Sequence, residues 1–409
     1  MLILVVKSKS PSVNPYKIMR LTCFLLTIVA AGFSALAAVA PDYTLHEWGT
    51  FTSISGSDGA LLPGLEREEE ALPMFVKSHD GMQSRLTGGK GWLRPLHNVT
   101  IKMETPVIYF YTDQPFDAQV KVGFNGGSIS QWFPERSGGE NPPPYTKNLP
   151  MLPMGGDIDF AKGYHGGIEW DVRVQPPTAT DSAAIFKPNE TLTWVYPRQT
   201  DAAVVRTKNG EAEKYLFYRG VGNFKLPIRF TSPSDGMLRI ENSAAAAVPA
   251  MLVFNHREDG KVSFAMLDAV KAGETRSVSL SEPSISTDWQ PEVYRAMSQA
   301  LVEAGLYQKE ADAMLQTWWR SYFQRPGLRA FWIVPAPVTE EILPLAVQPT
   351  PKKQVRVLVG RSELLSPAFE KSLVTEFAKG DQNRWRYDRY FPAFEARVNA
   401  LKPRLAVGR

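Results

Sequence analysis

Apolar and polar side chains alternate with a period of two across most of the region from residue 43 to residue 281. Successive side chains of a strand face opposite sides of a sheet, so this period predicts strands. Asn209-Gly210 and Asp259-Gly260 supply the positive φ angles of tight hairpin turns. We therefore predict a mainly β, antiparallel, sandwich-like domain over 41–285, with strands in segments 98–112, 118–125, 166–176, 190–200, 213–224, 236–243, 248–257, 261–269 and 275–281.

The period changes to that of a helix after about residue 290. Apolar residues recur at helical spacing around residues 293–302 and again over 308–323, with Gly305 as a C-terminal cap between them. Strands are predicted at 329–335 and 355–359, and Ser366-Pro367 and Gly380 mark the start and end of another helix. We predict a smaller C-terminal α/β or helical module over 286–409.

The N-terminus carries the pattern of a secretory signal peptide. Lys17 and Arg20 precede an apolar run, and small residues ending at Ala37 form an A-x-A cleavage site. The alternative, an uncleaved anchor, needs an apolar run of roughly 20 residues, which is longer than this one. We expect residues 1–37 to be removed, with 1–18 as an upstream extension if translation starts at Met19. The mature protein would then be periplasmic or extracellular, without a transmembrane segment.

Cleavage would also change the charge and the cysteine content. Residues 1–37 contain Lys7, Lys9, Lys17 and Arg20 and no acidic residue, so 46 basic and 42 acidic residues become 42 of each. No basic stripe remains that would indicate a nucleic-acid partner. The single cysteine, Cys23, lies in the leader, so the mature chain has no thiol ligand or nucleophile.

The stretch HEWGTFTS, residues 46–53, places His46 beside Glu47 as in a metal or catalytic site. In a strand these two side chains face opposite sides and cannot share an ion. Glu47 would lie on an apolar face, where a carboxylate needs a partner. Arg219, within the apolar run YLFYRGV, is the predicted partner in a structural ion pair with Glu47.

No metal or other cofactor is expected. The five histidines show no HExxH-type spacing, and GGDIDF lacks the further ligands of a calcium loop. A site assembled from distant segments stays open as an alternative, with His46, His97, His165, Asp157 and Asp159 as candidate ligands.

Two pairs of charged residues lie on strand faces. Glu169 and Asp171 are about 6.6 Å apart along a strand, a spacing seen in glycoside hydrolases. A solvent-facing charged row is the favoured interpretation, because Trp170 and Val172 take the other face. For Lys102 and Glu104 we predict a surface ion pair.

Two long connections, 56–96 and 135–167, are the expected place for a ligand site, because long loops in compact domains are often functional. Covering sheet edges is the alternative role. Aromatic residues beside glycine-rich turns could stack on a ligand. The candidate ligand-binding residues are Trp92, Trp132, Tyr145 and Tyr164.

Five segments resemble recurring blocks of a family of exported bacterial proteins without an assigned activity. They are HEWGTFTS, KMETPVIYFYT (102–112), YLFYRGVGNF (215–224), TWWRSYFQRPGLRAFWIVP (317–335) and VRVLVGRSELLSP (355–367). The resemblance implies export and a shared fold and assigns no catalytic residue.

Two classes of function remain. The first is a non-catalytic binding or structural protein of the cell envelope, with a glycan, an envelope component or a protein as its ligand. The alternative is a secreted hydrolase whose carboxylates or histidines meet only in three dimensions. The first is favoured because no GxSxG, GxGxxG or Walker motif occurs.

Overall fold

The computed structural model describes residues 41–70, 72–79, 96–140, 158–178, 181, 185–187, 190–280, 288–381, 385–386 and 388–407. The predicted leader at residues 1–37 lies outside this part of the chain. Residues 40–409 form one compact unit. Within the described residues, no helix combines the length and the apolar character needed to cross a membrane.

One large sheet of 16 strands dominates the described structure. Its main path runs through β12 (Ala212–Glu213), β11 (Val204–Thr207), β10 (His165–Gln175), β7 (Gly127–Phe133), β13 (Leu216–Gly222), β4 (Ile101–Met103), β1 (Thr44–Ser55), β21 (Lys353–Leu364), β19 (Gly327–Ile333), β16 (Met251–His256) and β17 (Val262–Leu267). Attached to this path are β2 (Lys77–Ser78), β5 (Val107–Tyr111), β6 (Phe116–Asn125), β8 (Gly138–Gly139) and β20 (Leu345–Gln348).

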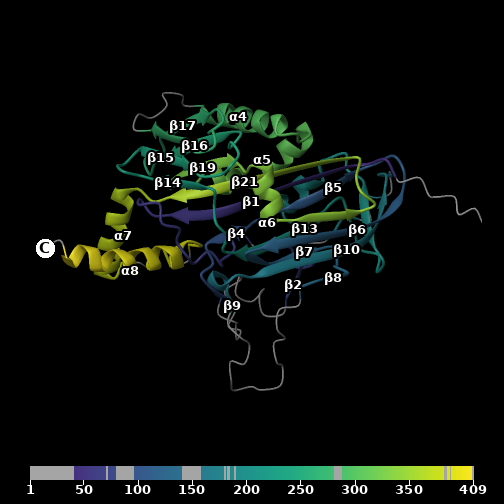
Figure 1. The fold of residues 1–409 in the computed structure, drawn as a ribbon, viewed down its shortest axis with the longest axis horizontal. Helices are drawn as coiled ribbons and strands as arrows, with labels where there is room; N and C mark the ends of the chain where they lie inside the picture. Colours follow the sequence, from purple (N-terminus) through teal and green to yellow (C-terminus); the bar gives the residue numbers. More distant parts are fainter. Residues whose placement is uncertain are drawn as a thin grey trace, which may run out of the picture. The chain divides into compact units, whose positions relative to one another are not determined.

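The sheet turns back on itself at the β6–β7 connection, so that two layers face each other as in a sandwich (Figure 1). β6 and β10 form one layer, and β13, β5 and β1 lie in the other. Alternate residues of both layers share one apolar core, and the rings of Trp170 on β10 and Tyr218 on β13 lie 6.3 Å apart. Alternation on each strand therefore builds the core, as the period of two predicted.

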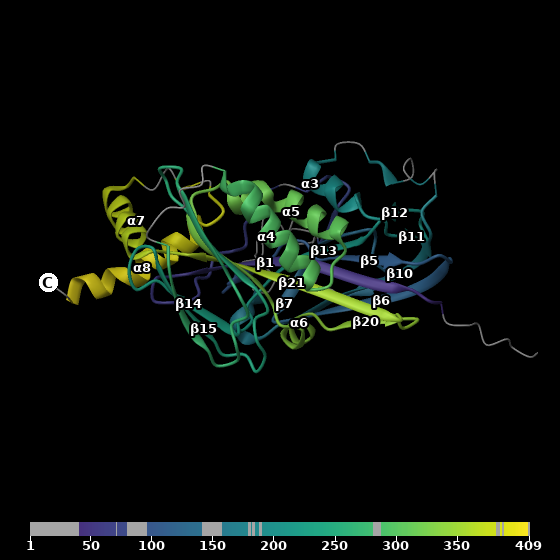
Figure 2. The same ribbon diagram turned by 90° about the horizontal axis from the view of Figure 1, so that it is seen from above.

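Helices cover the outer face of the layer that contains β1. A second core joins Trp48 of β1 to apolar residues of α3 (Leu192–Val195), α4 (Trp289–Glu303) and α5 (Gln308–Phe323). Figure 2 shows α4 and α5 lying over β1 and β21. The helix predicted over 308–323 is confirmed as α5, and its apolar residues Ala311, Met314, Leu315, Trp318 and Tyr322 are buried.

The remaining elements of the described structure are two further small sheets, three helices and two 3-10 turns. β14 (Ile228–Thr231), β15 (Met237–Asn242) and β18 (Thr275–Ser279) form a three-stranded sheet, and β3 (Leu96–His97) pairs with β9 (Ile158–Asp159). The other helices are α6 (Ala336–Ile342), α7 (Pro367–Lys379) and α8 (Phe391–Val407), with 3-10 turns at Phe160–Lys162 and Tyr196–Arg198. Ser366 caps α7 and Gly380 ends it in the left-handed conformation, as predicted. Both predicted hairpin turns are also present, at Gly210 and Gly260.

The mainly β fold is thus confirmed, and its sheet is mixed. β1 and β21 pair in parallel from Thr44↔Lys353 to Ser55↔Leu364. β16 pairs with β19, so strands on both sides of residue 285 belong to the same sheet. The local period of two shows that a segment is extended, and it carries no information on which distant segment lies beside it.

Candidate functional site

The HEWGTFTS stretch forms the centre of β1, and its side chains alternate as expected. His46 faces the helices, where its Nδ1 lies 2.7 Å from Oε2 of Glu310 on α5. Glu47 faces the sandwich core, where it accepts hydrogen bonds from the hydroxyl of Tyr218 at 2.7 Å and from Nε of Arg356 at 2.6 Å. The two neighbours therefore have separate partners on opposite faces of the sheet.

The predicted ion pair of Glu47 with Arg219 is wrong, although a buried Glu47 does have a cationic partner. Arg356 is directly opposite Glu47 in the parallel pairing of β1 and β21. On β13, Tyr218 takes the face toward Glu47, and Arg219 binds Glu68, with Nη1 2.7 Å from Oε2. Because adjacent side chains on a strand point opposite ways, only one of them could reach Glu47.

Arg219 belongs to a buried set of five cations and four carboxylates, which we call the charge network. The cations are Lys102, Arg219, Arg329, Arg361 and Arg389, and the carboxylates are Glu68, Glu69, Glu104 and Glu363. No side chain in this set is more than 9% exposed. The predicted surface ion pair of Lys102 and Glu104 is therefore wrong, because both residues lie inside the protein.

The segment that contains Glu68 and Glu69 supplies half of the negative charge of the network. Glu68 bridges Lys102, at 2.5 Å, and Arg219, at 2.7 Å. Glu69 bridges Arg361, at 3.0 Å, and Arg389, at 2.9 Å. The acidic run at residues 66–70 thus places two carboxylates among buried cations.

Glu104 and Glu363 complete the network from inside the sheet. Glu104 accepts from Arg389 Nη2 at 2.6 Å and from the Thr52 hydroxyl at 3.0 Å. Glu363 accepts from Arg361 and Arg329 at 2.6 and 3.2 Å. Burial alone would raise the pKa of the Glu104 carboxyl, but Arg389, Arg219 and Lys102 together lower it to about 2. Glu104 is therefore a permanent anion near neutral pH.

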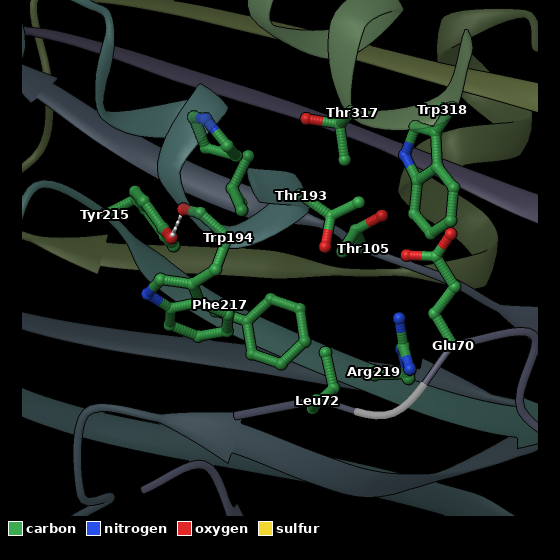
Figure 3. A pocket seen from close by; sticks show the side chains of 12 residues that line it. Glu70, Leu72, Thr105, Thr193, Trp194, Tyr215, Phe217, Arg219, Thr317 and Trp318 are labelled. Carbon is green, nitrogen blue, oxygen red and sulfur yellow. Dashed lines mark hydrogen bonds between the residues drawn. The ribbon is translucent and has the colours of Figure 1, made fainter. Parts of the chain in front are cut away.

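A small pocket opens beside the network, between β5, β13, α3 and α5 (Figure 3). Its volume is about 20 Å³, and its apolar walls are Leu72, Val107, Trp194, Pro197 and Phe217. The polar residues that line it include Glu70, Thr105, Arg219 and Trp318. A cavity with this volume and polar partners has room for about one or two water-sized groups.

Two of these polar residues have a side-chain atom without a hydrogen-bond partner among the described residues. The Thr105 hydroxyl and the Trp318 ring nitrogen are buried and unpartnered, and the residues are 8% and 4% exposed. Figure 3 shows the ring nitrogen of Trp318 on the side of Thr317 and Thr105. An unsatisfied buried donor costs about 1–3 kcal/mol, so both groups favour an external partner.

Charged groups of both signs also face this pocket. Glu70 forms no hydrogen bond or ion pair with any residue that the structure describes. Arg219 uses Nη1 for Glu68 and Nε for the Glu104 carbonyl oxygen, at 2.7 and 2.6 Å. The pocket thus offers hydrogen-bond donors, one free carboxylate acceptor and aromatic walls.

The candidate aromatic ligand residues do not gather at this pocket. Trp132, a candidate for stacking on a ligand, is 4% exposed and packs between the ring of His79, at 4.9 Å, and the guanidinium of Arg136, at 4.5 Å. Because the neighbouring segments cover the ring, it has no free face for a ligand. Tyr164 is half-buried and donates to Oε2 of Glu140 at 2.9 Å. Trp92 and Tyr145 lie outside the described residues.

The candidate metal ligands are likewise distributed over separate places. His46 binds Glu310, His97 is paired in register with Asp159, and His165 contacts Oδ1 of Asn125 at 3.1 Å. Among the described residues, no group of three or more His, Cys, Asp or Glu side chains is arranged to hold a metal ion. Asp157 lies outside the described residues.

The remaining charged row is on the surface, as predicted. Glu169 pairs with Lys121 at 2.5 Å with side chains 31% and 66% exposed, and Asp171 accepts from Gln119 at 3.1 Å. The two long connections do meet, where β3 pairs with β9. The pocket lies elsewhere and takes only Glu70 and Leu72 from the first connection.

Sequence reasoning missed the charge network and the pocket. One signal was available, because Arg219 and Arg361 each interrupt an apolar strand sequence, LFYRGV and VLVGRSELL. A charged residue within a buried strand requires a buried counter-charge. The five segments that carry the family resemblance supply most of these residues.

Comparisons with known proteins assign no family. No protein-family model and no curated protein matches the sequence. Among solved structures, the yeast delta-COP-I mu-homology domain complexed with a WxWxV peptide is similar at a TM-score of 0.28 and 6% identity, covering 79% of this chain and 98% of that chain. The Fcho1 mu-homology domain from Danio rerio with a bound peptide is similar at a TM-score of 0.27 and 7% identity, covering 80% and 96%. TM-scores at this level do not establish a common fold and transfer no partner.

Proposed function

We propose that this chain is a non-catalytic binding protein whose pocket beside the charge network anchors its ligand. One observation carries the proposal: the unpartnered Thr105 hydroxyl and Trp318 ring nitrogen line the same pocket as the free carboxylate of Glu70. Unsatisfied groups in one cavity favour an external molecule that completes their hydrogen bonds.

The state of the buried carboxyls supports binding rather than hydrolysis. A general acid needs a carboxyl whose pKa lies near the working pH. The pKa values of Glu104 and Glu363 are instead lowered, because their arginine partners outweigh the effect of burial. Burial does raise the pKa of Glu140 and of Glu213, but both oxygens of each accept hydrogen bonds from the protein itself. The donors include Ser128 and Tyr164 for Glu140, and Trp194 and Arg198 for Glu213. These carboxyls hold the structure together.

The place of action follows from the leader. We propose that residues 1–37 direct export and that the mature chain works in the periplasm or outside the cell, as the resemblance to exported bacterial proteins implies. The ligand would then be an envelope glycan, another envelope component or a protein. Fractionation of cells that produce the full chain, with sequencing of the mature N-terminus, tests this part.

A pocket-filling variant tests the binding function. Thr193 lines the pocket from α3, and its neighbour Leu192 is 69% exposed. We expect a ligand from a panel of glycans, peptides and lipid head groups to raise the melting temperature of the wild-type protein and of Leu192→Phe, but not of Thr193→Phe. Stabilisation of Thr193→Phe equal to that of the control, or turnover of an ester or glycan in the panel, would overturn the proposal.

A further inference from the structure

We propose that the pocket accepts a hydroxyl group of an uncharged saccharide. This inference deepens the proposed binding function and rests on it. Among a glycan, another envelope component and a protein, the ligand is then a glycan. The size, the open hydrogen-bond positions and the charge of the pocket each support this ligand.

The size of the pocket restricts the part of the ligand that enters. A volume of about 20 Å³ holds one or two water-sized groups. A hydroxyl or hydroxymethyl group has this size, whereas a whole sugar ring or an amino-acid side chain with several heavy atoms is larger. The rest of the ligand would therefore stay at the mouth of the pocket.

The open hydrogen-bond positions match a hydroxyl oxygen. Trp318 can only donate, Thr105 can donate or accept, and Glu70 offers carboxylate oxygens as acceptors. A hydroxyl both accepts and donates at one atom, so it can satisfy donors and an acceptor within a small space. A peptide amide divides these roles between its N–H and its C=O and needs a longer cavity.

The charges at the pocket favour a neutral group. An anionic ligand group would face Glu70, and a cationic group would face Arg219. The positive charge of Arg219 is also already compensated by Glu68 at 2.7 Å. An uncharged group meets neither repulsion.

The walls suit the carbon of a hydroxymethyl group. Trp194, Phe217 and Trp318 line the pocket with aromatic carbon. Aromatic rings provide rigid apolar surface next to polar groups, which is the combination that a hydroxymethyl group with its C–H and O–H bonds requires.

Calorimetric titration of the mature chain tests the ligand class. The probes are neutral oligosaccharides of hexose and N-acetylhexosamine, their single-deoxy analogues, a uronic acid oligomer, a glucosamine oligomer and uncharged peptides. We expect a neutral oligosaccharide to bind and one deoxy position to weaken binding. Thr105→Val, which has the same shape without the hydroxyl, should weaken it about tenfold, whereas the control Thr375→Val on the exposed face of α7 should not.

The outcomes separate this inference from the proposed function. Equal saccharide affinity in wild type and Thr105→Val, or Thr105-dependent binding of a charged sugar or a peptide alone, would overturn the saccharide inference. If a non-saccharide ligand binds and Thr193→Phe abolishes its binding, the inference fails and the binding function stands. If no probe of any class responds to Thr193→Phe, both fail.

Discussion

The charge network and the pocket lie side by side, since both include Arg219 and residues of the connection between β4 and β5. They differ in whether their polar groups find partners within the chain. In the network each charged side chain has at least one oppositely charged partner from the same chain. In the pocket, Thr105 and Trp318 each have one polar side-chain atom, and that atom has no partner in the part of the chain that the structure describes. A buried polar group without a hydrogen-bond partner lowers stability, so its presence indicates that the residue has another role.

Removing a network cation should have the largest effect. Arg389 donates to both Glu69 and Glu104, so Arg389→Met leaves two carboxylates short of a partner. We expect the free energy of unfolding to fall by about 3–5 kcal/mol in urea denaturation. The control Arg295→Met, on the exposed face of α4, should change it by less than about 0.5 kcal/mol. Equal effects would mean that water, not the partner charges, stabilises the network.

Acid should weaken the network through Glu104. The pKa of this carboxyl is lowered to about 2 from 4.5, so ionised Glu104 contributes stability above about pH 4.5. The contribution, about 3 kcal/mol, should be lost as the pH falls toward 2. Denaturation at a series of pH values should show a smaller loss in Glu104→Gln than in wild type. Parallel pH profiles would contradict this assignment.

Two threonine-to-valine substitutions compare the regions directly. The Thr52 hydroxyl donates to ionised Glu104, whereas the Thr105 hydroxyl is unpartnered. Thr52→Val should lower the free energy of unfolding by about 1.5–3 kcal/mol, because the charged acceptor loses a donor. Thr105→Val should be neutral or slightly stabilising in the absence of ligand. A similar loss in both variants would remove the distinction between network and pocket.

The exposed charged row should show the smallest effect. Glu169 and Lys121 are 2.5 Å apart, but their side chains are 31% and 66% exposed. Water already solvates both charges, so Glu169→Gln should change the free energy of unfolding by less than about 0.5 kcal/mol. If Glu169→Gln lowered the free energy of unfolding as much as Arg389→Met, burial would not explain the larger contribution expected of the charge network.

Local features of the fold were predictable because they depend on residues close together in the chain. The alternation around Trp48 and Phe51, the inward face of α5 and the cap at Ser366 follow from side-chain spacing within a few positions. The same alternation correctly separated His46 from Glu47. The pocket was not predictable, because its residues come from segments that are adjacent only after folding.

By itself, the sequence determined most of the extended and helical segments, which side chains of a strand share a face and that a buried Glu47 requires a partner. The strand predicted at 190–200 is wrong, because this segment forms α3 and the 3-10 turn at Tyr196–Arg198. The tertiary structure decided which partner that is, because Arg356 reaches Glu47 only through the parallel pairing of β1 with β21. The tertiary structure also decided that Glu69 of the acidic run at 66–70 pairs with the buried Arg361. It brought Arg389 into contact with Glu104, which lies 285 positions away in the sequence. Periodicity and capping act over one or two turns or strands, whereas the burial and pairing of charges depend on contacts that the local pattern does not encode.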